Sequence, residues 1–234
     1  MLFSEGPVFV HADSLSQTVD AVHQAEFERR KIPAPQALAA ARWIAARQGL
    51  PGAYGGTFAA FDQETAKGIS LFTGERVTSA SARHILGEEA CRALRFLKIT
   101  DSVVQTALER GNEGLMRCVA RAAKDPRNNN PGLYCCGKCT VGFWRNLLSG
   151  GLDRQEERLW RGVQHLRSAR DGEGGWRRFP FWYTTLSLSQ MEFRGAKEEL
   201  EYARVKIEQT ARRRGMHGAF AHRRYTLACR VLGL

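Results

Sequence analysis

The sequence predicts an all-α fold built from helical hairpins. Apolar residues recur at intervals of three and four along most of the chain, as they do on one face of an α-helix. Glycine and proline fall between these periodic segments, where short connections are expected, and no segment shows the strict alternation of a half-buried strand. Helices joined by short loops pack as antiparallel pairs. We therefore expect stacked helical hairpins in one domain over residues 1–234.

The N-terminal third of the chain is expected to hold two helices, over residues 14–30 and 36–48. Ser14 is a good capping residue for the first helix, which Pro33 and Pro35 separate from the second. The second helix is rich in alanine, the strongest helix former, and ends in the glycine-rich stretch after Gln48. The apolar segment 57–72 is ambiguous between helix and strand.

The rest of the chain predicts a nearly unbroken series of helices. Thr100 or Asp101 can cap a helix that follows directly on its predecessor, and a loop is expected at 124–132, which holds two prolines and three asparagines. The helices are expected over residues 79–99, 103–123, 135–149, 153–169, 181–193, 196–213 and 218–232.

Composition restricts the class of protein. The chain is 43% hydrophobic and 25% charged, which is ordinary for a globular protein. No apolar run of about 18 residues is present, and the first residues lack a basic stretch followed by a long apolar one, so we expect neither a membrane span nor a secretion signal. The six cysteines are not spaced as a disulfide framework. These features favour a reducing, cytoplasmic location, and they set no oligomeric state.

Excess positive charge requires that nucleic acid be considered as a partner. The formal net charge is +11, and basic residues gather at 29–31, 176–179 and 211–224. A solvated basic face is the simpler interpretation, and it is the one we favour. Binding to phosphates would weaken steeply with salt, which distinguishes the two interpretations.

Two glycine-rich stretches resemble each other and predict a repeat. Residues 46–56 (ARQGLPGAYGG) and 169–179 (ARDGEGGWRRF) both begin at a helix end and continue through glycines to an aromatic residue, Tyr54 or Trp176. Gln164 and Trp176 are expected to join the turn of one hairpin to its neighbour. A hairpin of this kind cannot bury its apolar face alone, so neighbours must stack.

Residues 161–164 (RGVQ) and 174–176 (GGW) resemble the repeat of squalene cyclases and of the β-subunits of protein prenyltransferases. The stretch that begins at Cys139 (CTVGFWR) is similar to the prenyltransferase segment that carries a zinc-binding cysteine, and 181–189 (FWYTTLSLS) is similar to the segment that carries the zinc histidine. The resemblance implies an α/α toroid whose inner helices line a central cavity. The zinc triad is incomplete, because the family's aspartate falls on Gly137 and its histidine on Tyr183. The acidic motif of the cyclases is absent.

The cysteine cluster at Cys135, Cys136 and Cys139 has three interpretations. Cys136 and Cys139 have the spacing of one pair of zinc ligands, and a structural site needs two more ligands, for which His217 and His222 are the remaining candidates. A catalytic zinc site needs only three protein ligands, which Cys136 or Cys135, Cys139 and one histidine would supply. Alternatively, a thiol at a helix N-terminus near Lys138 and Arg145 would have a lowered pKa, as in redox or nucleophilic cysteines. The third interpretation is that small side chains pack the start of an inner helix.

Two further groups are candidates for a site. His84 and Glu88, four residues apart on one helix, would form a general base and its orienting carboxylate, or simply an intrahelical pair. Aromatic side chains could line an apolar pocket or pack the core. Arg177 and Arg178 beside them could hold an anionic head group such as a diphosphate, or be ordinary surface arginines. The aromatic candidates for the pocket are Phe143, Trp144, Trp176, Phe181 and Trp182.

Together these features favour a cytoplasmic toroid protein with a central pocket lined by residues 135–145 and 176–185. The pocket would bind or transform an apolar molecule, isoprenoid-like or anionic. If the protein is an enzyme, we expect Cys136 and Cys139 as thiolates or zinc ligands, Tyr183 as a proton-handling phenol, and Glu88 with His84 as an acid–base pair. The alternative is a helical-repeat module that binds protein or nucleic acid and catalyses nothing.

Overall fold

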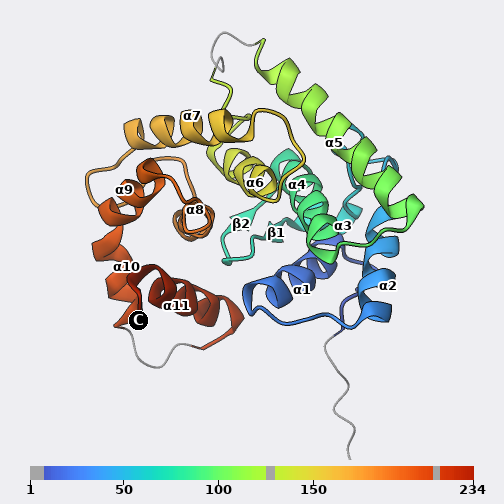
Figure 1. Ribbon diagram of the computed structural model, residues 1–234, viewed down its shortest axis with the longest axis horizontal. Helices are drawn as coiled ribbons and strands as arrows, with labels where there is room; N and C mark the ends of the chain where they lie inside the picture. The colour runs from blue at the N-terminus through green and yellow to red at the C-terminus, as the bar shows by residue number, and fades with distance from the viewer. Residues whose placement is uncertain (1–7, 125–129, 213–216) are drawn as a thin grey trace, which may run out of the picture. The chain divides into compact units, whose positions relative to one another are not determined.

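We describe a computed structural model of the 234-residue chain, covering residues 8–124, 130–212 and 217–234. Helices account for 63% of the described residues, which contain eleven α-helices (Figure 1). The prediction of a mainly helical chain is confirmed. Contacts within the chain divide it into two compact units, which are described separately below. The single domain expected over 1–234 stays a prediction.

Unit 1 comprises Met1–Ile69 and Val77–Arg121. Its long helix α4 lies against α1, α2, α3 and the short 3-10 helix η1. Thirteen of the 18 residues of α4 are buried, as expected of a central helix. Its elements are α1 (Leu15–Phe27), α2 (Ala34–Ala45), η1 (Tyr54–Gly56), α3 (Asp62–Lys67), α4 (Ala80–Leu97) and α5 (Ser102–Ala122).

Capping residues account for the helix starts predicted in unit 1. The Ser14 side chain accepts a hydrogen bond from the backbone N–H of Gln17, so the cap expected for α1 is present. Asp101, rather than Thr100, caps α5, because its Oδ1 accepts from the N–H groups of Val103 and Val104 at 3.1 and 3.2 Å. These caps satisfy donors that the first turn of a helix leaves unpaired.

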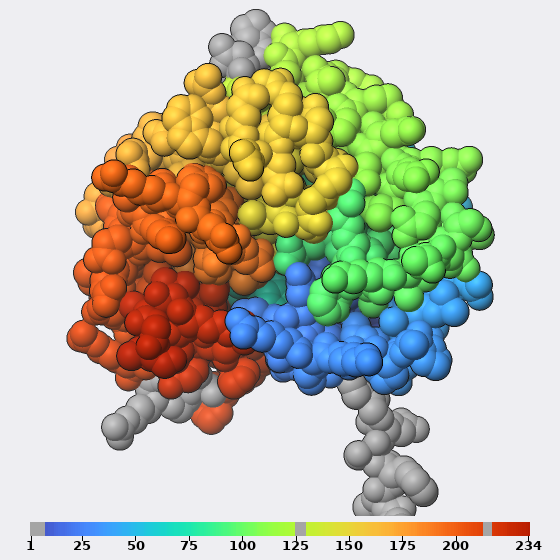
Figure 2. All heavy atoms as spheres, viewed as in Figure 1, coloured from blue at the N-terminus to red at the C-terminus, as the bar shows by residue number. Residues whose placement is uncertain are grey.

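Unit 2 comprises Ser70–Arg76 and Ala122–Leu234. Two strands of two residues each, β1 (Ile69–Ser70) and β2 (Arg76–Val77), pair as a hairpin whose tip belongs to this unit. Figure 2 shows the orange and red atoms of its last three helices as one continuous surface in this view. The helices of unit 2 are α6 (Gly137–Leu148), α7 (Gln155–Ser168), α8 (Phe181–Leu188), α9 (Arg194–Tyr202), α10 (Arg204–Ala211) and α11 (Ala219–Leu232).

The first four helices of unit 2 pack as two stacked hairpins. Helix α6 lies against α8, and α7 lies against α9, while each helix also contacts its hairpin partner (Figure 1). Nine of the 12 residues of α6 and six of the eight of α8 are buried, against five of 14 in α7 and two of nine in α9. Helices α6 and α8 are therefore the inner pair, and α7 and α9 the outer pair.

The structure corrects several expected boundaries. The ambiguous segment 57–72 contains the short helix α3 and strand β1. The helix expected at 181–193 ends at Leu188, and the one expected at 196–213 is divided at Ala203, whose N–H still bonds to the Glu199 carbonyl. Pro35 lies in the first turn of α2 instead of preceding it, a position where its missing N–H costs nothing. Residues 125–129 of the expected loop, and residue 213 at the end of the divided helix, lie outside the described residues.

Candidate functional site

Two hydrogen bonds fix the chain just before the cysteine cluster. The indole Nε1 of Trp144 donates to the Gly132 carbonyl at 2.7 Å, and the backbone N–H of Tyr134 donates to Thr140 Oγ1 at 3.0 Å. The Trp144 and Thr140 side chains, which make these bonds from α6, are both buried. The segment thus folds back on the helix it precedes, so the cysteines enter α6 along a defined path.

Close packing requires glycine at the start of α6. A Cβ atom on Gly137 would lie 2.2 Å from the carbonyl oxygen of Arg178, well inside van der Waals contact. Gly137, where the resemblance expects an aspartate, is therefore the one residue type that lets the α6 N-terminus abut the 178–179 backbone. This brings the cysteine segment against the aromatic segment within unit 2.

The three clustered thiols interact with one another. Cys136 is the N-cap residue of α6, in extended conformation, and Cys139 lies in the first turn of the helix. Cys135 and Cys136 are exposed, whereas Cys139 is fully buried. The thiols of Cys135 and Cys136 both hydrogen-bond with that of Cys139. One buried and two accessible sulfurs thus converge at a single helix terminus.

The expected lowering of thiol pKa is wrong for Cys135 and Cys139. The hydrogen bond with Cys136, together with burial, raises the pKa of Cys135 to about 11. Hydrogen bonds with Cys135 and Cys136, and then burial, raise the pKa of Cys139 far above its ordinary value. Ionising either thiol would place a thiolate against neighbouring sulfur in a partly dry site. At neutral pH both are therefore protonated, which disfavours a nucleophilic role in the metal-free protein.

The two cations expected to activate the thiols are engaged elsewhere. Lys138 Nζ donates to the Arg76 carbonyl at 3.4 Å. The Arg145 side chain is buried, with its guanidinium carbon 5.4 Å from the centre of the Tyr183 ring and its Nη1 3.4 Å from Gln190 Oε1. Neither of these contacts is with a sulfur atom.

Tyr183, where the resemblance noted above expects a zinc histidine, lies fully buried on α8. The β-hairpin tip fixes the start of that helix, because Glu75 Oε1 accepts from the N–H groups of Trp182 and Tyr183 at 2.8 and 3.0 Å. A carboxylate at a helix N-terminus accepts hydrogen bonds from otherwise unpaired N–H groups, and its negative charge interacts favourably with the positive end of the helix dipole. Sequence reasoning missed Glu75, because its partners follow more than 100 residues later.

Two buried hydroxyls lie on the same helix. Thr184 and Ser187 are fully buried, and their oxygens hydrogen-bond to no described residue. The neighbouring Thr185, by contrast, donates to the Phe181 carbonyl at 2.9 Å. Buried hydroxyls usually have a partner, so these two indicate a place for water or for a polar group of a ligand.

The predicted pocket aromatics divide into two groups. Phe143, Trp144 and Trp176 are buried in the core of unit 2, where the Trp144 indole ring stacks on Phe179 at 5.9 Å between centroids. Phe181 and Trp182 are half-buried and pack edge to face at 5.0 Å. Only this second pair retains surface that a ligand can contact without repacking the core.

The predicted cationic and histidine candidates lie on the surface. Arg177 is exposed, as are His217 and His222.

In the basic C-terminal stretch, Arg223 Nη1 donates to the Phe72 carbonyl at 2.9 Å and Arg224 Nε to the Thr73 carbonyl at 2.6 Å. These two arginines hold the hairpin tip. Residues 213–216 of the stretch lie outside the described residues.

His84 and Glu88 lie on α4 in unit 1, both buried. The His84 ring packs on Tyr54, with 3.4 Å between centroids and 37° between planes. A Cβ atom on Gly87 would lie 2.5 Å from Thr57 Oγ1, so the 54–57 segment packs directly on this face of α4. Burial, and then the charge of Glu88, raise the pKa of Cys91, which stays a thiol. The acid–base role of the pair stays a prediction.

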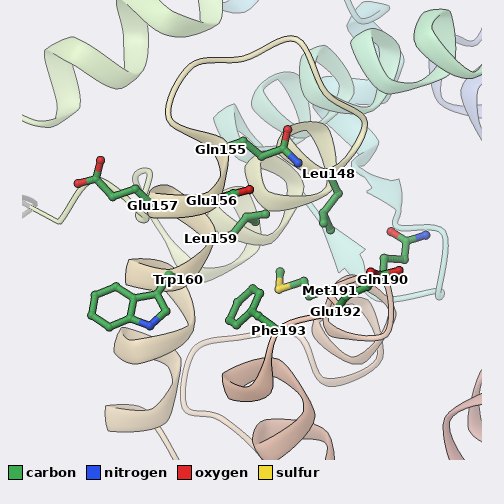
Figure 3. Close-up of a pocket in the computed structure, with 10 residues that line it drawn as sticks. All are labelled: Leu148, Gln155, Glu156, Glu157, Leu159, Trp160, Gln190, Met191, Glu192 and Phe193. Carbon is green, nitrogen blue, oxygen red and sulfur yellow. The ribbon is translucent and has the colours of Figure 1, made fainter.

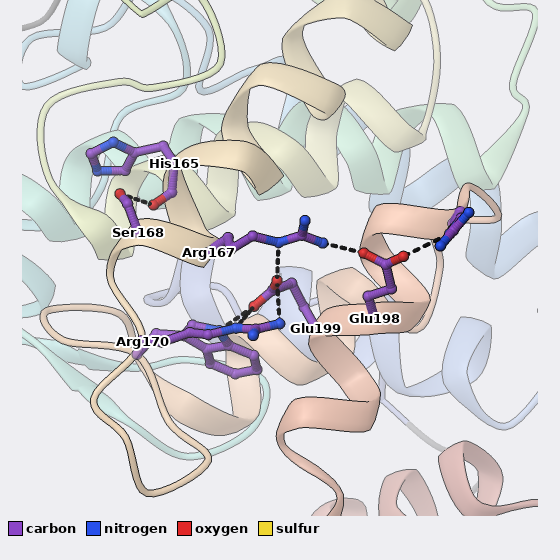
Figure 4. Close-up of polar contacts among 8 residues, drawn as sticks. His165, Arg167, Ser168, Arg170, Glu198 and Glu199 are labelled. Carbon is purple, nitrogen blue, oxygen red and sulfur yellow. Dashed lines mark hydrogen bonds and ion pairs between the residues drawn. The ribbon is translucent and has the colours of Figure 1, made fainter.

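An ionic network missed by sequence reasoning surrounds Trp176. Its indole Nε1 donates to Glu199 Oε2 at 3.0 Å, and Arg170 donates to both oxygens of the same carboxylate at 3.1 and 2.8 Å (Figure 4). Arg167 Nε adds a further bond at 3.1 Å. The expected partner, Gln164, takes no part in this network. Glu199 is fully buried, whereas its position on a charged amphipathic helix predicts a surface residue.

Comparison of the chain with protein-family models, with curated proteins and with solved structures finds no match. Among the described residues, no helix combines the length and the apolar character needed to cross a membrane.

Proposed function

We propose that this chain is a helical-repeat protein of the α/α-toroid type whose second unit binds a soft divalent metal ion, zinc above all, beside a site for a small apolar molecule. The thiols of Cys135, Cys136 and Cys139 supply the metal ligands. The mutual contact of these three thiols at the N-terminus of α6 is the observation that carries the proposal.

The packing of unit 2 supports the toroid. Inner helices α6 and α8 contact each other, and outer helices α7 and α9 do the same. This is the arrangement expected when helical hairpins stack around an axis, with the buried helix of each hairpin facing inward. The likeness to the squalene cyclase and prenyltransferase repeat, which covers the same two hairpins, points in the same direction.

The chemistry of the donors supports a soft metal. Thiolate sulfur is a preferred ligand of zinc, and a site with three protein ligands leaves a fourth position for water or a ligand. In such a site the metal acts as a Lewis acid toward what it binds. A bound cation would replace the thiol protons, whose hydrogen bonds between the sulfurs are the main cause of the raised pKa values of Cys135 and Cys139.

Features of α8 support a neighbouring ligand. Thr184 and Ser187 offer buried hydroxyls without a partner among the described residues, and Phe181 and Trp182 offer half-buried aromatic surface. A ligand that is mainly apolar with one or two hydrogen-bonding groups matches this combination.

Metal binding is tested directly by elemental analysis and by cobalt substitution. The purified chain is expected to retain about one zinc ion and, after exchange, to show the thiolate-to-cobalt absorption of a sulfur-ligated site. Affinity should rise with pH, because binding must displace thiol protons. Alanine substitution of each of the six histidines then identifies any nitrogen ligand.

Matched cysteine variants distinguish a site from adventitious binding. Cys135→Ser and Cys139→Ser should lose the metal and the cobalt spectrum, whereas Cys229→Ser, which alters a solitary cysteine on α11, should keep both. Circular dichroism shows that each variant is folded. Equal metal content in all three variants, or none in the parent chain at any pH, contradicts the proposal.

A further inference from the structure

A second concave site lies in unit 2, between the N-terminal half of α7 and the segment 190–193 that joins α8 to α9 (Figure 3). Its volume is about 700 Å³, within the range of small-molecule sites. None of its lining residues is a cysteine, and none was singled out by sequence reasoning. It is therefore separate from the thiol site.

The floor of this pocket is apolar. Leu159 and Met191 are buried beneath it, and Figure 3 shows Met191 and Phe193 facing α7. Trp160, at the side of the pocket, is 48% exposed, although a large aromatic side chain gains most from burial. Methionine and aromatic side chains adapt to varied apolar shapes, so the floor suits the hydrocarbon part of a ligand.

The rim of the pocket is acidic, in contrast to the net charge of +11. Glu156 and Glu192 are exposed at the rim, and within the described parts of the chain no ion pair involves either carboxylate. The third rim acid, Glu157, is neutralised by Arg154, whose Nε and Nη2 donate to it at 2.7 and 2.6 Å. Two negative charges therefore remain at the mouth.

Cations close to the pocket have partners of their own. Arg194 donates to Glu198 at 2.7 Å, and the buried Arg145 donates to the pocket residue Gln190. The guanidinium carbon of Arg161 lies 5.2 Å from the centre of the Trp160 ring, at the side of the pocket. These contacts leave the carboxylates of Glu156 and Glu192 available to a ligand.

We infer that this pocket binds an amphiphilic organic cation, with the apolar body on the floor and the ammonium or guanidinium group at the two carboxylates. Apolar burial supplies affinity, and the rim selects the sign of the charge. The inference is independent of the proposed metal site, because no lining residue is shared.

Calorimetry with a matched pair of probes tests the inference. Decyltrimethylammonium, kept well below its micellar concentration, should bind at a stoichiometry of one and perturb the fluorescence of Trp160. Decanoate, which has a similar chain and the opposite charge, should bind at least about tenfold more weakly, a difference of about 1.4 kcal/mol. Equal or tighter binding of decanoate overturns the inference.

Variants then locate the binding. The double variant Glu156→Gln/Glu192→Gln should weaken the cation about tenfold and leave decanoate unchanged or stronger. Trp160→Ala, at an exposed position that folding tolerates, should weaken both probes. Glu173→Gln removes an exposed carboxylate of the same unit outside the pocket and should change neither.

Two results contradict the inference. The first is cation binding that none of the pocket variants alters, which would place the probe elsewhere. The second is binding of a basic amphipathic peptide without any binding of the small cation, which would make the pocket part of a protein interface.

Discussion

Two glycine-rich turns, one in each unit, form the same bridge by different means. In unit 1, Gln48 pairs with Phe58 in an isolated antiparallel bridge after α2. In unit 2, Arg170 pairs with Trp176 in the same kind of bridge after α7. The backbone bonds correspond as well, since Ala59 donates to the Arg47 carbonyl as Arg177 donates to that of Ala169.

The chemistry that holds the two turns differs. Around the first bridge, Gln48 Nε2 donates to the Gly56 carbonyl at 2.9 Å and Arg47 Nε to the Ala59 carbonyl at 2.6 Å. No carboxylate accepts from the residues of that bridge in the described structure. Around the second, the Glu199 carboxylate accepts from both bridge residues, Arg170 and Trp176. One backbone motif is thus supported by side-chain-to-carbonyl bonds in one unit and by a buried charge in the other.

The comparison also corrects the predicted repeat. Sequence similarity aligns Tyr54 with Trp176. The two bridges instead make the fully buried Phe58 the structural equivalent of Trp176. The longer first turn contains η1, which places Tyr54 against His84 instead. Residues with the same structural role need not occupy the position that sequence similarity assigns them, because turn length changes between copies.

Removing the buried charge should have the largest effect. Glu199→Ala leaves Arg167, Arg170 and the Trp176 indole without their shared acceptor, and we expect a loss of about 3–5 kcal/mol in the free energy of unfolding. Urea denaturation measures the loss, and hydrogen exchange at 169–177 assigns it to the second turn. Glu198→Ala is the matched control.

The control alters the neighbouring carboxylate, which is 37% exposed and pairs with Arg167 and Arg194. It should cost about 1 kcal/mol or less. Equal costs for the two variants would show that the buried carboxylate has no special role in the turn.

Crowding in the first turn should produce the next largest effect. A Cβ atom on Gly55, at φ +61°, would lie 2.3 Å from Cys118 Sγ, so Gly55→Ala adds a steric clash to backbone strain. We expect a loss of about 2–3 kcal/mol by urea denaturation. Gly49→Ala, at φ +71° with no atom within 4 Å of its Cβ, should lose only about 1 kcal/mol. A larger loss for Gly49→Ala would contradict this packing.

Acid should weaken the second turn more than the first. Burial alone would raise the pKa of Asp171, but the backbone N–H groups of Gly175 and Glu173, with the Tyr202 hydroxyl and Lys206, outweigh it and lower the pKa to about 2. Because this pKa lies below the ordinary 3.8, protonation favours the unfolded state. The contribution of Asp171 is present above about pH 4 and is lost as the pH falls to about 2.

Asp171→Asn should therefore reduce the change in the free energy of unfolding between about pH 4 and pH 2 by about 1 kcal/mol. This value is reduced because solvent screens the partly exposed carboxylate. Urea midpoints for the parent and variant chains, measured from pH 5 downward, test this. Parallel profiles would mean that the network around Asp171 contributes nothing to folding.

The smallest effect is expected from the neutral bond of the first turn. Gln48→Ala removes the donor to the Gly56 carbonyl, and we expect a loss of about 0.5–1.5 kcal/mol. Gln63→Ala, which removes an exposed donor to the Asp13 carbonyl, should cost less. A loss for Gln48→Ala as large as that for Glu199→Ala would remove the contrast between the turns.

Sequence periodicity predicted most helices, because the buried face of an amphipathic helix appears in the sequence as apolar residues at intervals of three and four. It failed where tertiary contacts decide the boundary. Helix α8 ends at Leu188, before Met191 and Phe193, which face α7, and the division at Ala203 is not visible in the composition. The β-hairpin was missed because two-residue strands are too short to alternate.

The site was predictable only where its residues are contiguous. Three cysteines within five residues are visible in any reading, and the segment 181–189 was identified by resemblance. Glu199 and Glu75 were not, because a buried carboxylate has the same sequence signature as a solvated one until its partners are known. Lowered thiol pKa values were expected from the helix terminus, but contact between the thiols has the greater influence.

The hairpin tip of unit 2 is synthesised long before the α11 residues that bind it. Phe72 leaves the ribosome early, yet Arg223, which donates to its carbonyl, follows 151 residues later. At the usual rate of translation this delay is about 8–30 s. Throughout that interval the nascent chain carries the carbonyls of Phe72 and Thr73 without the arginines that will donate to them. The contact between the hairpin tip and α11 can consequently form only after Arg223 has been synthesised, and truncation before α11 should leave an intermediate that chaperones can recognise.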